Sequence, residues 1–304
     1  MPSPPPPRAV FAMDPVHLPL LFPSPLMARL RRTADVDPAL VVRDFADPAV
    51  VGALAGAEVL LTGWGCPHLD AGVLAAAPRL RAVLHAAGSV RSLVGEAVWK
   101  QGVTVSSAVT GNALPVAEYT LAMILLLGKD AFEHRERYRR THARPTLAET
   151  ASTGNLGRRV GVIGASRVGR RLMELLRPFD LTVLLYDPCV SSAEAAALGA
   201  EPLPLEELLR HSDIVSLHAP DIPETRHMLD RARLALIPDG GALINTARGA
   251  LVDQDALTKE LVSGRLRAVL DVTATAQPVM CVTAGRQDIA VFSGRHDDMA
   301  ELVL

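Results

Sequence analysis

The sequence predicts an α/β protein of two domains, each with a parallel β-sheet covered by helices. The chain has 304 residues, and single hydrophobic cores stop growing at about 250–300 residues, so two domains are expected. Short apolar runs with the composition of strands alternate with helix-like segments along most of the chain. This alternation comes in two successive blocks, and it is typical of parallel sheets with helices on both faces.

The first block predicts a domain over residues 1–113. Helix-like segments, such as residues 47–54, separate its short β-like runs. The expected strands are residues 9–11, 59–62, 80–84 and 103–105.

The second block predicts another domain over residues 114–275, followed by a tail over residues 276–304. It opens with an apolar helix over residues 116–127. An arginine-rich stretch over residues 129–159 follows, and we interpret it as a solvated helix face and loop. The alternation then becomes sharper, with a helix expected over residues 167–177. The expected strands are residues 160–163, 181–186, 214–217, 242–245 and 268–271.

Composition and charge argue against several classes of function. The formal net charge is −2 and the arginine-rich stretch has no interleaved aromatic pattern, so nucleic acid is not expected as a partner. Three scattered cysteines predict no metal site and a reducing, cytoplasmic compartment. The opening MPSPPPPR lacks the apolar core of a secretory signal. Residues 113–128 are apolar, but they contain Glu118 and are fewer than the roughly 20 residues that a membrane span needs. This stretch therefore predicts a buried helix and no membrane role.

A glycine-rich motif, GASRVG over residues 164–169, follows a strand and opens a helix. Gly164 permits a tight turn, and Gly169 lets the helix pack closely on the strand. The helix N-terminus offers backbone N–H groups and a positive dipole end to a pyrophosphate. Ser166 replaces the middle glycine of the usual fingerprint, where its Cβ crowds the phosphates although its hydroxyl can donate a hydrogen bond. The motif predicts a dinucleotide-binding Rossmann domain.

An aspartate stands where such a domain needs a carboxylate. Asp187 follows Gly164 by 23 residues and ends the next expected strand. A carboxylate there accepts hydrogen bonds from the adenosine ribose hydroxyls, and its charge repels a 2′-phosphate. The cofactor is therefore predicted to be NAD in preference to NADP. The alternative is that Asp187 only caps the turn after the strand.

Several further sequence motifs occur in a characteristic order along the chain. They are VAEYTLAMILLL, VGVIGASRVGRRL, VSLHAP with ETRHML, and INTARGALVDQDAL, with TGWG and HAAGS earlier. Over about residues 8–273 the chain thus resembles the D-isomer-specific 2-hydroxyacid dehydrogenases of the formate, glycerate and phosphoglycerate dehydrogenase type. The resemblance implies two Rossmann-like domains, a flavodoxin-like substrate domain and an NAD-binding domain. It also implies hydride transfer between NADH and a 2-keto acid, giving a D-2-hydroxy acid, and a homodimer that uses the helix at 116–127.

The resemblance implies roles for the matching positions. Arg248 would bind the substrate carboxylate and polarise the keto oxygen, which suits a guanidinium with two parallel donors; the alternative is a surface arginine in a turn. Gly88 and Ser89 would hold the carboxylate through backbone N–H groups, and Asp271 would orient the nicotinamide carboxamide. His218, in LHAP, matches a non-catalytic position and is predicted to be structural. The remaining matches are cofactor contacts: Arg167, Val168, Ala219, Pro220, Thr246 and Ala247.

The chain departs from the family after Val272. The family continues with an acidic, proline-bearing segment and then a proline–histidine pair, whose histidine is the general acid–base. On a simple count Ala276 stands where a glutamate would hydrogen-bond that histidine, and no proline–histidine pair follows. The only later histidine is His296, whose surroundings lack the expected strand-to-loop context. The family's terminal helix is not recognised either, a pattern that a shifted reading frame or a truncated gene would produce.

Impaired activity is the expectation that follows from this tail. Two alternatives stay open at this point. The chain could be a non-catalytic NAD-binding protein, either a sensor or a decayed gene product, or it could be a corepressor-like interaction protein. Fold alone does not choose among these, because one fold hosts many functions.

Overall fold

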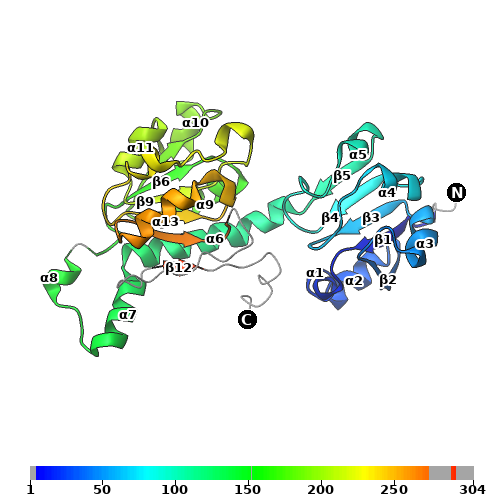
Figure 1. The fold of residues 1–304 in the computed structure, drawn as a ribbon, viewed down its shortest axis with the longest axis horizontal. Coiled ribbons are helices and arrows are strands. Elements are labelled where there is room, and N and C mark those ends of the chain that lie inside the picture. Colours follow the sequence, from blue (N-terminus) through cyan, green and yellow to red (C-terminus); the bar gives the residue numbers. More distant parts are fainter. Residues whose placement is uncertain (1–4, 152, 274–288, 292–304) are drawn as a thin grey trace. The chain divides into compact units, whose positions relative to one another are not determined.

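The structure is a computed structural model that describes residues 5–151, 153–273 and 289–291. The described residues divide into two compact units, one ending at Asn112 and the other beginning at Ala113. Figure 1 shows a sheet with helices packed around it in each unit. Both sheets are parallel, so the predicted fold class is confirmed.

Unit 1, residues 5–112, contains a five-stranded sheet with the order β2-β1-β3-β4-β5. The sequence does not predict β2, because Asp35, Asp37 and Pro38 are poor strand formers. The pairing of β2 with β1 jumps from Val36 to Val41, and Pro38 lies in this irregular part at the sheet edge, where proline is tolerated. The strands are β1 (Arg8–Ala12), β2 (Asp35–Val42), β3 (Val59–Thr62), β4 (Ala82–His85) and β5 (Thr104–Ser107).

Helices cover both faces of the sheet in unit 1. Val10 and Leu60 point to a hydrophobic cluster that includes residues of α3, α4 and α5, whereas Phe11 and Leu61 point to a second cluster with α1 and α2. This alternation follows from the two-residue period of a strand. The helix expected at residues 47–54 is divided between η2 and α3. The helices are η1 (Pro15–His17), α1 (Leu18–Leu21), α2 (Ser24–Leu30), η2 (Pro48–Val50), α3 (Val51–Gly56), α4 (Ala71–Ala76) and α5 (Glu96–Lys100).

Unit 2 contains a seven-stranded parallel sheet with the order β12-β11-β10-β9-β6-β7-β8. Five of its strands match the expected ones, whereas β8 and β12 are short additions at the two edges. The chain runs outward from β6 in both directions, so the strand order reverses at β6, and ligands of such sheets bind at the carboxyl ends of the strands near this point. The strands are β6 (Arg159–Ile163), β7 (Thr182–Tyr186), β8 (Glu201–Pro202), β9 (Ile214–Leu217), β10 (Ala242–Asn245), β11 (Arg267–Leu270) and β12 (Ile289–Val291).

Helices also cover both faces of the sheet in unit 2. One buried cluster packs α11, α12 and α13 on the sheet, and another packs α6, α9 and α10. The arginine-rich stretch forms α7 and α8, which extend away from the sheet (Figure 1), and α7 has no buried residue, in line with the expected solvated face. The helices are α6 (Val109–Gly128), α7 (Ala131–Thr141), α8 (Leu147–Thr150), α9 (Arg167–Leu176), α10 (Ser192–Ala197), α11 (Leu205–His211), η3 (Pro223–Thr225), α12 (Arg231–Leu234), η4 (Gly249–Leu251) and α13 (Gln254–Val262).

The apolar helix α6 is buried on one side. Within the described part of the chain it is the one helix long and apolar enough to cross a membrane by length and composition. Its residues Ala117 and Ile124 are fully buried in the core of unit 2, whereas Leu114 and Leu126 are exposed. The buried helix predicted from the sequence is therefore observed for the side that faces the sheet.

Candidate active site

Most of the predicted site residues lie at the carboxyl edge of the sheet in unit 2. Each strand from β6 to β11, except the short β8, is followed at this edge by a residue that is predicted from the sequence to belong to the site. Parallel strands bring these positions to one side of the sheet. They are Gly164 after β6, Asp187 after β7, Ala219 and Pro220 after β9, Thr246 to Arg248 after β10, and Asp271 after β11.

The two outer glycines of the fingerprint have steric reasons to be glycine. Gly164 has φ +98°, and a Cβ there would lie 2.7–2.8 Å from backbone atoms of His218 and Ala219. A Cβ on Gly169 would overlap the carbonyl oxygen of Gly164. The first turn of α9 can therefore sit against the end of β6, which leaves the helix N-terminus facing the carboxyl edge.

Ser166 is the N-cap of α9. Its Oγ accepts a hydrogen bond from the backbone N–H of Gly169 at 3.4 Å. The hydroxyl proton is not used in this contact, so the side chain can still donate to a phosphate oxygen. Only the phosphate contact of Ser166 is predicted from the sequence, and the capping role explains why a serine is stable at this position.

Asp187 caps its own turn and also holds the fingerprint loop. Its Oδ1 accepts the N–H of Cys189 at 2.8 Å, and its Oδ2 accepts the N–H of Ala165 at 2.7 Å. The capping alternative is therefore part of the observed structure. Each carboxylate oxygen has a second lone pair, so this arrangement leaves acceptor capacity for ribose hydroxyls.

A buried asparagine shapes the turn that carries Arg248. Asn245 ends β10, and its side chain accepts the N–H of Ala247 at 3.1 Å and donates to the carbonyl of Arg248 at 2.9 Å. Arg248 itself is exposed, with Nη1 donating to the carbonyl of Ala247 at 2.5 Å. Asn245 was not predicted from the sequence as a positioning residue, although an asparagine at the end of an apolar strand indicates such a role.

The predicted carboxylate loop lies in unit 1. Gly88 and Ser89 follow β4 at the carboxyl edge of its sheet, and Ser89 Oγ accepts the N–H of Arg91 at 3.3 Å. Just before this loop, buried His85 shares a hydrogen bond of 2.9 Å with Thr62 at the end of β3. Burial lowers the pKa of His85, which favours its neutral form. The pair ties the ends of two neighbouring strands below the loop.

His218 is enclosed in the core of unit 2 at the end of β9. Its Nε2 lies 2.8 Å from the Oγ of Ser216, and burial lowers its pKa to about 4. Its Cβ would lie 3.3 Å from a Cβ on Gly169. These contacts support the structural role expected for His218, since it packs beneath the fingerprint turn.

The buried His218 is expected to make stability depend on pH. Its ordinary pKa is about 6.5, so between pH 6.5 and 4 the unfolded chain binds a proton that the folded protein does not. The free energy of unfolding therefore falls as pH decreases through this window, by roughly 3 kcal/mol for a shift of this size. Urea unfolding at pH 7 and pH 4.5 should show that His218→Asn loses most of this pH dependence.

A matched control for this prediction is His211→Asn, because His211 is exposed at the end of α11. That variant should keep the pH dependence of the natural chain. Equal pH dependence for His218→Asn and the natural chain would contradict the prediction.

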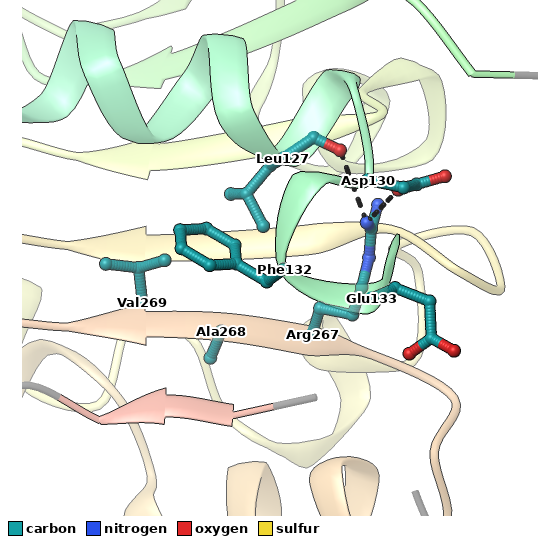
Figure 2. Close-up of a pocket in the computed structure, with 7 residues that line it drawn as sticks. All are labelled: Leu127, Asp130, Phe132, Glu133, Arg267, Ala268 and Val269. Atoms are coloured by element: carbon teal, nitrogen blue, oxygen red, sulfur yellow. Dashed lines mark hydrogen bonds and ion pairs between the residues drawn. The ribbon is translucent and has the colours of Figure 1, made fainter. Parts of the chain in front are cut away.

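A pocket near the other end of β11 lies away from this edge. Figure 2 shows Arg267, the first residue of β11, donating to the carbonyl of Leu127 and pairing with Asp130. About 13 Å of strand separates Arg267 from Asp271. The pocket is thus no candidate for the dinucleotide. Its lining residues are Leu127, Asp130, Phe132, Glu133, Arg267, Ala268 and Val269.

The two remaining sequence expectations concern the general acid–base region and metal binding. Ala276 and His296 lie outside the described residues, so their places in the site stay predictions. Among the described residues, no group of three or more His, Cys, Asp or Glu side chains is placed to hold a metal ion.

The amino-acid sequence of this unit matches a known family. Residues 121–281, slightly more than half of the chain, match the family model described as D-isomer specific 2-hydroxyacid dehydrogenase, NAD binding domain. The chain belongs to the D-isomer specific 2-hydroxyacid dehydrogenase family. The matched part is an NAD-binding domain, and its cofactor is NAD. The match ends at residue 281, inside the tail in which the sequence departs from the family pattern.

Named relatives and solved structures agree with this assignment. D-3-phosphoglycerate dehydrogenase of Mycobacterium bovis is 37% identical over 213 residues, which are 68% of this chain and 39% of the relative. The Sus scrofa protein of that name is 31% identical over 217 residues, or 68% and 38%. The crystal structure of D-lactate dehydrogenase from Aquifex aeolicus complexed with NAD and lactic acid has a TM-score of 0.71 and 27% identity, covering 88% of this chain and 78% of that one. The chain spans about two fifths of the length of the curated relatives it matches.

Proposed function

We propose that this chain binds NAD at the carboxyl edge of unit 2 and is a dehydrogenase of small 2-keto or D-2-hydroxy acids with impaired activity. The observation that carries the proposal is the gathering of Gly164, Asp187, Arg248 and Asp271 at one edge of one sheet. When bound, NADH supplies the hydride that reduces the keto carbon. The fit is supported by the glycine turn, which lets α9 begin directly after β6 at this edge, and by the lone pairs of Asp187.

The residues of the chain have separate tasks in this proposal. Arg248 binds the carboxylate of the substrate and stabilises the negative charge that develops on the keto oxygen. Asn245 keeps the Arg248 turn in place. The loop of Gly88 and Ser89 is assigned to the substrate carboxylate through its backbone N–H groups. A proton must finally reach the oxygen, and water has to deliver it unless a general acid is present.

A non-catalytic NAD-binding protein is the second candidate function. The sequence of the tail favours this second function, because residues 273–304 contain no proline–histidine pair and Ala276 replaces the glutamate. A panel of 2-keto acids assayed with NADH separates the two functions. NADH consumption that depends on the keto acid supports the dehydrogenase, whereas NADH binding without any consumption supports the non-catalytic NAD-binding protein.

Asp187 should make the protein prefer NADH over NADPH. Asp187→Ala is expected to weaken NADH binding by about 10- to 100-fold, because hydrogen bonds to a charged group contribute roughly 1.5–3 kcal/mol. NADPH binding should change less, since removing the carboxylate also removes its repulsion of the 2′-phosphate. Fluorescence titration with both nucleotides measures the two affinities.

Two further variants make this titration specific, because Asp187 also holds two backbone amides. Asp187→Asn keeps one acceptor oxygen, so it should also weaken NADH binding, but by less than Asp187→Ala does. Asp180→Asn, at an exposed position before β7, should leave both affinities unchanged. If the natural chain binds NADPH as tightly as NADH, the ribose assignment of Asp187 is wrong.

We also propose a cytoplasmic homodimer. Leu114 and Leu126 of α6 are 41% and 37% exposed, and a second copy would cover this apolar surface. In the described part of the chain Cys66 and Cys189 are free thiols, which suits a reducing compartment. Light scattering of the purified chain tests the dimer, and a monomer at micromolar concentration would exclude it. Cell fractionation tests the location.

A further inference from the structure

The hydroxyl group of Tyr119 is buried in unit 2 and has no hydrogen-bond partner among the residues that the structure describes. Tyr119 lies on α6, and its ring packs against the hydrophobic cluster between α6, α9 and the sheet. Within the described residues its Oη is one of three buried side-chain polar atoms that lack a partner. Buried polar groups in native proteins are nearly always hydrogen-bonded, so this hydroxyl is expected to take a partner, of which a bound ligand is one.

The contacts of the next residue along α6, Thr120, show which part of unit 2 lies next to Tyr119. Thr120 Oγ1 lies 3.3 Å from Thr246 Oγ1, in the turn after β10. The last residues of β10 and β11 are paired, and the N–H of Asp271 donates to the carbonyl of Asn245 at 3.1 Å. Thr246 and Asp271 are thus neighbours at the carboxyl edge, and α6 meets that edge at Tyr119 and Thr120.

Tyr119 is a hydrogen-bond donor at neutral pH. Burial, together with the negative charge of Asp271, raises the pKa of Tyr119 to about 12. The hydroxyl therefore keeps its proton, and the contacts of Thr120, Thr246 and Asn245 place Tyr119 and Asp271 at the same edge of unit 2. A hydroxyl donor and a carboxylate at the same edge match the chemistry of a primary amide, which has one carbonyl acceptor and one amino donor.

We propose that Tyr119 is a positioning residue for the nicotinamide end of bound NAD. Its hydroxyl donates to the carbonyl oxygen of the carboxamide, whose amino group donates to Asp271. The two contacts together set which way the carboxamide points and therefore which face of the ring is presented to the substrate. The inference rests on NAD binding in unit 2 but not on turnover, so it holds for an active or an inactive chain.

The test compares ligands that differ at the nicotinamide end. Calorimetric titration of Tyr119→Phe should show NADH binding weaker by about 2- to 12-fold, the range for one lost hydrogen bond. Binding of ADP-ribose, which lacks the nicotinamide, should be unchanged. The melting temperature of the unliganded variant should be unchanged or higher, since an unpaired buried hydroxyl has been removed. Tyr138→Phe, at an exposed position on α7, is the matched control and should alter none of these values.

A third ligand tells a direct contact from one that acts through Asp271. The 3-acetylpyridine analogue of NADH keeps the carbonyl oxygen but has no amino group. Tyr119→Phe should weaken binding of this analogue as much as it weakens NADH, whereas Asp271→Asn should weaken the analogue less than NADH.

Three outcomes would overturn the inference: NADH affinity unaffected by Tyr119→Phe, an equal loss for ADP-ribose and NADH, or a loss that disappears with the analogue. Failure of the natural chain to bind NADH and ADP-ribose would instead contradict the proposed NAD site itself.

Discussion

Arg248→Ala is expected to lower the rate of 2-keto-acid reduction by about 10²–10³-fold, or roughly 2.7–4 kcal/mol in the activation barrier. The reason is that the keto oxygen gains negative charge as the carbon is reduced, and a fixed cationic donor stabilises that charge more than it stabilises the ground state. NADH affinity should barely change, because Arg248 is assigned to the substrate. Steady-state rates at saturating NADH, together with NADH titration, measure both effects.

The structure suggests why the expected effect is specific to this arginine. Arg248 is exposed, and its backbone is held by buried Asn245, so removing the side chain leaves the turn intact. Arg248→Lys keeps the charge but loses the two parallel donors, and its rate should fall between those of alanine and arginine. Arg231→Ala, at an exposed position in α12, is the control and should keep the natural rate. Unchanged turnover in Arg248→Ala would show that Arg248 is not the substrate arginine.

The sequence predicted the fold where strands are buried and apolar. The five central strands of unit 2 were predicted because both faces of a parallel sheet are covered, which makes each strand a short apolar run such as residues 160–163. β2 was missed for the opposite reason, because an edge strand can contain Asp35 and Pro38 at low cost. β8 is only two residues long, which is too short to show the alternating hydrophobic pattern of a strand.

The site was predictable as far as its residues follow strand ends. Gly164, Asp187 and Asp271 each stand directly after an apolar run, and parallel topology then brings them to one edge. Roles that depend on side-chain contacts could not be predicted from the sequence. Asn245 braces the Arg248 turn through its side chain, and the apolar pattern around Tyr119 gave no sign that one hydroxyl would be buried without a partner.

The 304-residue chain is expected to reduce 2-keto acids about 10²–10⁴-fold more slowly than the same chain with a family-type tail from residue 273 onward. That factor is the usual contribution of a general acid–base, and the natural tail supplies neither the proline–histidine pair nor the glutamate. NADH affinity should be nearly equal in the two proteins, because the fingerprint and Asp187 precede the departure. Turnover of both proteins is compared over a panel of 2-keto acids, alongside NADH titration.

A low but measurable rate is still consistent with this expectation, because water can deliver the proton and Arg248 can still stabilise the charge on the oxygen. The expectation separates two parts of catalysis: charge stabilisation depends on residues before 273, whereas proton transfer depends on residues after it. Turnover by the natural chain near 10 s⁻¹, the median for enzymes, would refute it. His296→Ala then identifies the source of that turnover, since a loss of rate in this variant would make His296 the proton donor despite its unfamiliar surroundings.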